Sequence, residues 1–221
     1  MYFNRNIMSE LLKNIDESID RLLELGKETF EARPLCIYDL YCSAVLNKYV
    51  NLLRGFTQLM RDNNYISAVP LVRVHLSLFL QLYASTLVSY GFDEFSKKIF
   101  KGRRIHNMKD SDGKLMKEKY LAKKFSKREG LGWMSVMYDE VGNGYAHYSN
   151  FIASSAHSFL EDEEKVMPII LSEDGFVSDA EKLETSIKIN QITENMLAFI
   201  NTRKAQKKDY FINRTYKTMT R

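Results

Sequence analysis

The chain has 221 residues, of which 45% are hydrophobic and 27% charged, with 32 Lys+Arg, 28 Asp+Glu and three prolines. This composition excludes a disordered chain, a collagen-like chain and a disulfide scaffold, and the length fits one domain with a sizeable core. The two cysteines, Cys36 and Cys42, favour a reducing compartment. The N-terminal stretch lacks the continuous apolar segment of a signal peptide, so we expect a cytoplasmic protein.

The first three elements are predicted as helices from apolar residues that recur every three or four positions. The first covers about 7–31, and Pro34 ends it; the second covers 36–63 and ends at Asn63-Asn64. The third covers about 67–90 and is apolar on almost every side. It is long enough to cross a membrane, but Arg73, His75 and Gln81 interrupt it. We therefore expect the central helix of a bundle and no membrane association.

Residues 97–128 are rich in lysine and poor in apolar side chains, with a turn predicted at 110–113. They indicate a short helix, a loop and another short helix, inserted between core elements. Helical spacing returns over 131–141, and 166–177 is predicted to form a small β-hairpin. Ser178 to Glu181 has the pattern of a capping box before a final helix that ends near Arg203. The sequence predicts a single all-α bundle of about five long helices over 1–203, followed by a basic tail over 204–221.

Familiar catalytic signatures are absent from the sequence: it has no GxGxxG, P-loop, HExxH, CxxC or GxSxG pattern. His106 stands four residues before Asp110, and His157 four before Glu161, but a metal site needs three or four converging ligands. We therefore expect no cofactor and no metal.

His147 is the first candidate for chemistry, because it follows Gly142 and Gly144 at the end of a predicted helix, with Asn143 four residues before it. An imidazole titrates near neutral pH and suits general acid–base catalysis. A histidine at a helix C-terminus is equally well explained by the helix dipole. Both interpretations remain open.

Arg73 is the second candidate, because it lies in the most apolar helix and its guanidinium needs partners. Its helical face continues through Ser77, Gln81 and Ser85. The second helix carries a similar polar track, at Asn47, Asn51, Arg54, Gln58 and Arg61. The two tracks predict a shared internal cleft, and the alternative is a solvated stripe.

The segment 142–147 resembles the terminal motif of HEPN domains, all-α bundles found in many prokaryotic toxins and defence ribonucleases. That motif is an arginine, a polar residue, three variable residues and a histidine. Asn143 and His147 match it, whereas Gly142 stands at the arginine position. The resemblance implies a dimeric, metal-independent endoribonuclease only where that arginine is present. Over about residues 36–150 the chain also looks like a diverged bacterial bundle family, in which a long helix with a central arginine, here Leu71-Val72-Arg73, precedes a helix that ends in histidine-x-serine, here His147-Tyr148-Ser149. Under that resemblance Arg73 would replace the missing arginine in space.

Charge is divided into opposed blocks along the chain. Residues 97–128 carry 13 Lys+Arg and 3 Asp+Glu, a net of +10; residues 129–202 carry 3 against 13, a net of −10; and 203–221 carry 7 against 1, a net of +6. Basic blocks with interleaved aromatics bind nucleic acids, although such a block also docks on acidic protein surfaces. The candidate nucleic-acid contacts are Lys97, Lys98, Lys101, Arg103, Arg104, Lys123 and Lys124.

These observations lead to two hypotheses. In the first, the chain is a HEPN-like protein of a toxin or phage-defence system that binds or cleaves RNA. His147 would then be the general acid–base, Arg73 would stabilise the developing charge and Asn143 would orient the phosphate. In the second, it is a non-catalytic homodimeric module that binds a protein partner or nucleic acid through its charged blocks.

Overall fold

A computed structural model describes residues 2–30, 35–128, 132–143 and 177–219, with residues 2–5, 141–143 and 208–219 described by their backbone alone. Within these ranges the chain forms seven α-helices, a single 3₁₀ turn and no strand, which confirms the all-α prediction. In chain order the elements are α1 (Tyr2–Phe30), α2 (Ile37–Arg61), α3 (Tyr65–Ala84), α4 (Phe92–Phe100), η1 (Ile105–Asn107), α5 (Glu118–Ser126), α6 (Trp133–Asn143) and α8 (Asp179–Met219).

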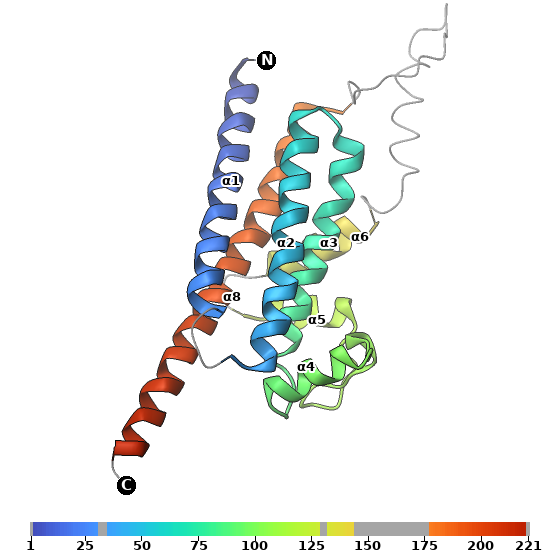
Figure 1. Cartoon of the computed structure of the whole chain (residues 1–221). Coiled ribbons are helices and arrows are strands. Elements are labelled where there is room, and N and C mark those ends of the chain that lie inside the picture. The colour runs from blue at the N-terminus through green and yellow to red at the C-terminus, as the bar shows by residue number, and fades with distance from the viewer. Residues whose placement is uncertain (1, 31–34, 129–131, 144–176, 220–221) are drawn as a thin grey trace, which may run out of the picture.

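Four long helices, α1, α2, α3 and α8, lie side by side, and α4 and α5 pack at one end of this bundle (Figure 1). α1 lies against α8 and α2, while α3 contacts α2, α5, α6 and α8. Gly26 of α1 permits the close approach to α2, because a Cβ there would come within 2.7 Å of Leu46 Cδ2. Because α1 lies against α8, the first and the last of the described helices are neighbours in the bundle.

α3 is the central helix of the bundle, as its sequence predicts. Among the described residues it alone is long and apolar enough to cross a membrane, but 56% of its most apolar window is buried in the fold. Its position among four helices accounts for that hydropathy. His75 is fully buried in α3, with Nδ1 2.7 Å from the Leu71 carbonyl and Nε2 3.3 Å from the Tyr49 carbonyl.

Hydroxyl pairs hold α8 to the helices beneath it. The Tyr49 hydroxyl lies 2.9 Å from Thr193 Oγ1, and the Tyr65 hydroxyl lies 2.8 Å from Thr185 Oγ1. All four side chains are buried, so each hydroxyl satisfies the other in a dry interface. These pairs fix the register of α8 against α2 and α3.

The basic segment 97–128 has the predicted order of short helix, loop and short helix, except that α4 begins earlier, at Phe92. The predicted turn is present: Gly113 has φ +76° and its N–H donates to the Asp110 carbonyl at 3.0 Å. The segment is more than an appendage to the bundle, because its apolar side chains join the common core, namely Met108, Met116, Leu121, Ala122 and Phe125.

The C-terminal region differs from the prediction. The final helix was expected to end near Arg203, where its apolar stripe ends, yet α8 continues to Met219. Polar anchors replace the stripe: Lys204 Nζ lies 2.5 Å from Glu28 Oε2, and Lys207 Nζ donates to Thr29 O and Asp39 Oδ2, both at 3.0 Å. The predicted hairpin over 166–177 lies outside the described residues, apart from Val177, which is buried.

Candidate nucleic-acid interface

The seven predicted nucleic-acid contacts divide into two groups. Five of them are exposed and form no ion pair within the described part of the chain: Lys97, Lys101, Arg103, Arg104 and Lys123, which we call the basic surface. Lys98 instead pairs with Glu94 at 2.9 Å and lies 3.6 Å from the centre of the Tyr90 ring. Lys124 is occupied by Asp110 and Asp112.

Lys124 belongs to a structural cluster around the buried Asp110 carboxylate. Asp110 Oδ1 accepts the N–H groups of Asp112 and Lys114 at 3.0 and 2.9 Å, and Oδ2 accepts Tyr120 Oη at 2.5 Å and Lys124 Nζ at 2.6 Å. Burial opposes ionisation of this carboxyl, but the hydrogen bonds from Lys124 and Tyr120 outweigh burial and hold the pKa of Asp110 well below its usual range. Lys124 therefore has a structural role in closing the loop 110–114, and this role competes with its predicted contact with nucleic acid.

Arg73 joins three helices. Its Nη2 donates to Glu118 Oε2 of α5 at 2.6 Å and to the Tyr138 hydroxyl of α6 at 2.9 Å. Ser77 Oγ donates to the other Glu118 oxygen at 2.5 Å, and Gln81 Nε2 donates to Ser77 Oγ at 3.2 Å. Arg73, Ser77 and Gln81 of the predicted polar face thus form a connected network with Glu118, whereas Ser85 pairs with the Tyr38 hydroxyl at 2.7 Å instead.

The second polar track does not line a cleft with the first. Its members on α2, Asn47, Asn51, Arg54, Gln58 and Arg61, are all exposed. Gln58 Nε2 donates to the Asp62 carboxylate, and Arg61 pairs with Asp16. The prediction of a shared cleft is wrong for this track, because the apolar stripe of α2 faces the bundle and turns the polar stripe to solvent.

A cavity of about 280 Å³ opens beside the Arg73 network and connects it with the basic surface. Arg103, Arg104 and His106 line it, together with Gln81 and Glu118. The Glu118 carboxylate is already engaged by Arg73 and Ser77, so two further guanidinium groups make the cavity cationic. Arginine donors around a recess are suited to phosphate oxygens.

The sequence did not identify Glu118 as the partner of Arg73, since 45 residues separate them. One signal was present: Glu118 is the only acidic residue between Asp112 and Glu129 in an otherwise basic stretch. A lone carboxylate there is a natural partner for the single arginine of α3.

The other two catalytic candidates are not placed by the structure. His147 lies outside the described residues, and Asn143 is the last residue of α6, where only the backbone is described. Arg73 contacts α6 through Tyr138, with its guanidinium carbon 4.0 Å from the centre of that ring. The predicted convergence of Arg73, Asn143 and His147 remains a prediction. Within the described ranges no group of three or more metal-binding side chains occurs.

Comparison of the chain with models of protein families, with curated proteins and with solved structures finds no match.

Proposed function

We propose that the protein binds RNA through its basic surface and the adjoining arginine-lined cavity, and that the bundle acts as a binding module rather than a nuclease. The observation that carries this proposal is the exposure of five cationic side chains on one segment without ion-pair partners in the described chain. Two of them, Arg103 and Arg104, also line the recess beside Glu118.

The acidic side chains of the segment are used internally, which leaves the five cations of the basic surface without an ion-pair partner in the described chain. Asp110 and Asp112 hold Lys124, and Glu118 holds Arg73. A surface with this excess of positive charge attracts a polyanion and releases the counterions condensed on it. The segment's net charge of +10 in 32 residues (97–128) therefore supports a nucleic acid as the partner.

The competing explanation is that the basic segment docks on the chain's own acidic block, residues 129–202. The ion pairs of the described acids in that block argue against this explanation. Asp139 pairs with Lys119, Glu140 and Glu184 pair with Lys188, and Glu194 pairs with Arg21. Only one of these four pairs, Lys119–Asp139, involves the basic segment. The five side chains of the basic surface take no part in them.

The network of Arg73 supports binding over cleavage. A guanidinium that stabilises the transition state of phosphoryl transfer has to face the reacting phosphate, whereas Nη2 of Arg73 faces Glu118 and Tyr138, and its Nη1 is buried without a hydrogen-bond partner among the described residues. We assign Arg73 a structural role: it joins α3 to α5 through Glu118 and to α6 through Tyr138.

Fluorescence anisotropy with a labelled single-stranded RNA of mixed sequence tests the proposal. A variant with all five basic-surface residues changed to glutamine is expected to lose binding, while an unchanged affinity would refute it. The RNA is recovered after incubation in chelator and sized on a gel. RNA shortened by the wild type but intact with His147→Ala would refute the non-catalytic part and restore the nuclease hypothesis.

A further inference from the structure

A second cavity, of about 590 Å³, lies where α3, α5 and α8 meet near the start of α4. It shares no residue with the basic surface. Its floor is aromatic: the buried rings of Tyr38, Phe79, Tyr83 and Phe125 line it. Its rim is polar and exposed and includes Arg128, Thr202 and Gln206. A recess of this size with an apolar floor and a few polar groups has the character of a small-molecule site.

The rings of the floor are arranged to receive another ring. Tyr38 and Phe92 are stacked with their centres 4.7 Å apart. The Phe125 ring meets Phe79 and Tyr83 edge to face, at 5.0 and 4.9 Å. Stacked and edge-to-face contacts are the arrangements that aromatic groups prefer. A flat ring in the recess therefore gains favourable dispersion and quadrupole interactions with the rings of the floor.

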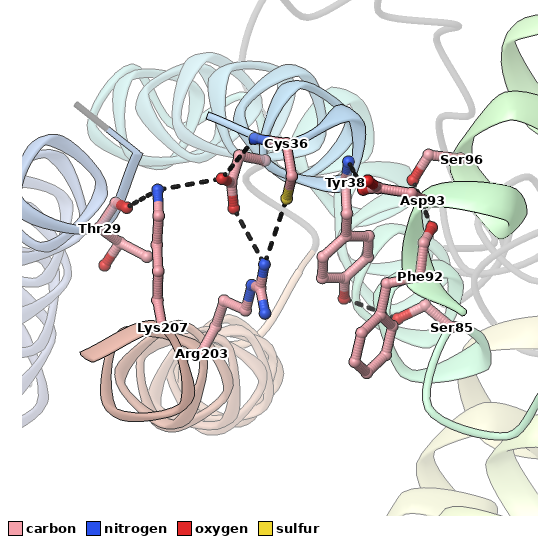
Figure 2. Close-up of polar contacts among 10 residues, drawn as sticks. Thr29, Cys36, Tyr38, Ser85, Phe92, Asp93, Ser96, Arg203 and Lys207 are labelled. Carbon is pink, nitrogen blue, oxygen red and sulfur yellow. Dashed lines mark hydrogen bonds and ion pairs between the residues drawn. The ribbon is translucent and has the colours of Figure 1, made fainter. Parts of the chain in front are cut away.

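α8 contributes the cation Arg203 to the wall of the cavity. Arg203 Nη2 donates to Asp39 Oδ1 at 3.2 Å and contacts Cys36 Sγ at 3.4 Å, while Lys207 Nζ donates to Asp39 Oδ2 at 3.0 Å (Figure 2). Two cations therefore share one carboxylate. Burial raises the pKa of the Cys36 thiol, so the thiol adds no negative charge at neutral pH.

Arg203 is also incompletely satisfied. Its Nε is buried and has no hydrogen-bond partner among the described residues. The guanidinium carbon lies 5.0 Å from the centre of the Tyr38 ring and 5.7 Å from that of Phe92. Arg128, on the same cavity, is a second cation with no ion pair in the described chain. A buried donor without an acceptor is costly, and an acceptor on a ligand would satisfy it.

We propose that this cavity binds a small aromatic acid, with its flat ring on the aromatic floor and its carboxylate between Arg203 and Arg128. The ring recognises the floor through stacking, and the acid group accepts hydrogen bonds from Arg203 and Arg128. Both features are required, because the tyrosine hydroxyls of the floor carry no positive charge to pair with the acid and the arginines offer no apolar surface of comparable extent. This inference does not depend on RNA binding.

Isothermal titration with three matched probes tests the proposal on the full chain. 1-Naphthoate carries both features, 1-naphthalenemethanol keeps the ring without the charge, and acetate keeps the charge without the ring. We expect 1-naphthoate to bind, and each of the other two to bind at least about tenfold more weakly, since a charged hydrogen bond contributes about 1.5–3 kcal/mol. Absence of 1-naphthoate binding at millimolar concentration, or equal binding of the alcohol, would overturn the proposal.

Two variants locate the site. Arg203→Gln and Arg128→Gln are each expected to weaken 1-naphthoate binding about tenfold, whereas Lys127→Gln removes a neighbouring exposed charge that does not line the cavity and should leave binding unchanged. Arg203→Gln also removes a contact of Asp39, so Arg128→Gln, on the exposed rim, is the decisive variant if the first fails to fold. Equal affinity of Arg128→Gln and Lys127→Gln would place the ligand elsewhere and refute the assignment.

Discussion

Replacing Arg103 and Arg104 together by glutamine tests the basic surface at its centre. Both side chains are exposed, both line the small cavity beside Glu118, and neither has an ion pair in the described structure. Their loss therefore removes charge without leaving a buried carboxylate unpaired, and we expect the thermal unfolding midpoint to stay unchanged. The expected effect falls on RNA affinity alone.

The magnitude follows from counting phosphate contacts. Each contact with single-stranded nucleic acid adds about 0.7 to the slope of log affinity against log salt. Five contacts predict a slope of about −3.5, and the double variant should reduce it by about 1.4. If the affinity extrapolated to 1 M salt stays constant, the same two contacts account for about 25-fold in affinity at 0.1 M salt.

Anisotropy titrations at several salt concentrations between about 0.05 and 0.3 M give both the affinity and the slope. The matched control is Lys48→Gln with Arg54→Gln, which removes two exposed cations from α2 and gives the same change in net charge. We expect this control to stay within about threefold of the wild type, because distant exposed charges are screened over about 10 Å at 0.1 M salt.

Two results would refute the reasoning. One is an equal loss of affinity in both double variants, which would show that net charge matters and its location does not. The other is a loss of affinity in the Arg103/Arg104 variant with no change in slope, which would indicate a contact other than phosphate.

Three further predictions concern stability and the roles of individual residues. Arg73→Gln should lower the free energy of unfolding by about 1 kcal/mol in urea, as expected for a partly exposed pair, and should change RNA affinity less than twofold; a tenfold loss would return Arg73 to the binding site. Asp110→Ala should lower the free energy of unfolding by about 2 kcal/mol in the same assay, because Tyr120 and Lys124 lose a buried acceptor. An effect below about 0.5 kcal/mol would contradict a structural role for the cluster around Asp110. Burial lowers the pKa of His75 to about 4, whereas the unfolded chain binds a proton near pH 6.5, so stability should fall by up to about 3 kcal/mol as pH drops from 6.5 to 4. His75→Gln should flatten that part of the curve of unfolding free energy against pH, and an unchanged curve would argue against a neutral buried imidazole.

Local sequence signals predicted the helices and several of their ends correctly. Asn63 follows the end of α2 and has φ +53°, as expected for an Asn-Asn pair that interrupts a helix. The capping box forms as predicted: the Glu181 N–H donates to Ser178 Oγ at 3.2 Å, and the Ser178 N–H donates to Glu181 Oε2 at 3.0 Å. These features depend on residues three or four positions apart, so spacing along the chain is sufficient to find them.

Contacts between distant segments were the part that spacing did not predict. Helical periodicity places Arg73, Ser77 and Gln81 on one face of α3, but it says nothing about which helix that face meets. The end of α8 was missed for a similar reason, because the anchors of Lys204 and Lys207 lie on α1 and α2, more than 160 residues earlier in the chain. The spacing of apolar residues identifies the buried stripe of a helix. It does not identify a helical turn that is held in place by ion pairs.

The pairing of α1 with α8 has a consequence for the nascent chain. α1 ends at Phe30 and α8 begins at Asp179, so about 150 residues are synthesised between the two. At about 5–20 residues per second this takes roughly 8 to 30 seconds, during which α2 is available to cover α1 but α8 is not. The ribosome-bound chain therefore exposes, for that time, the apolar surface of α1 that α8 covers in the fold, and exposed apolar surface of this kind promotes aggregation.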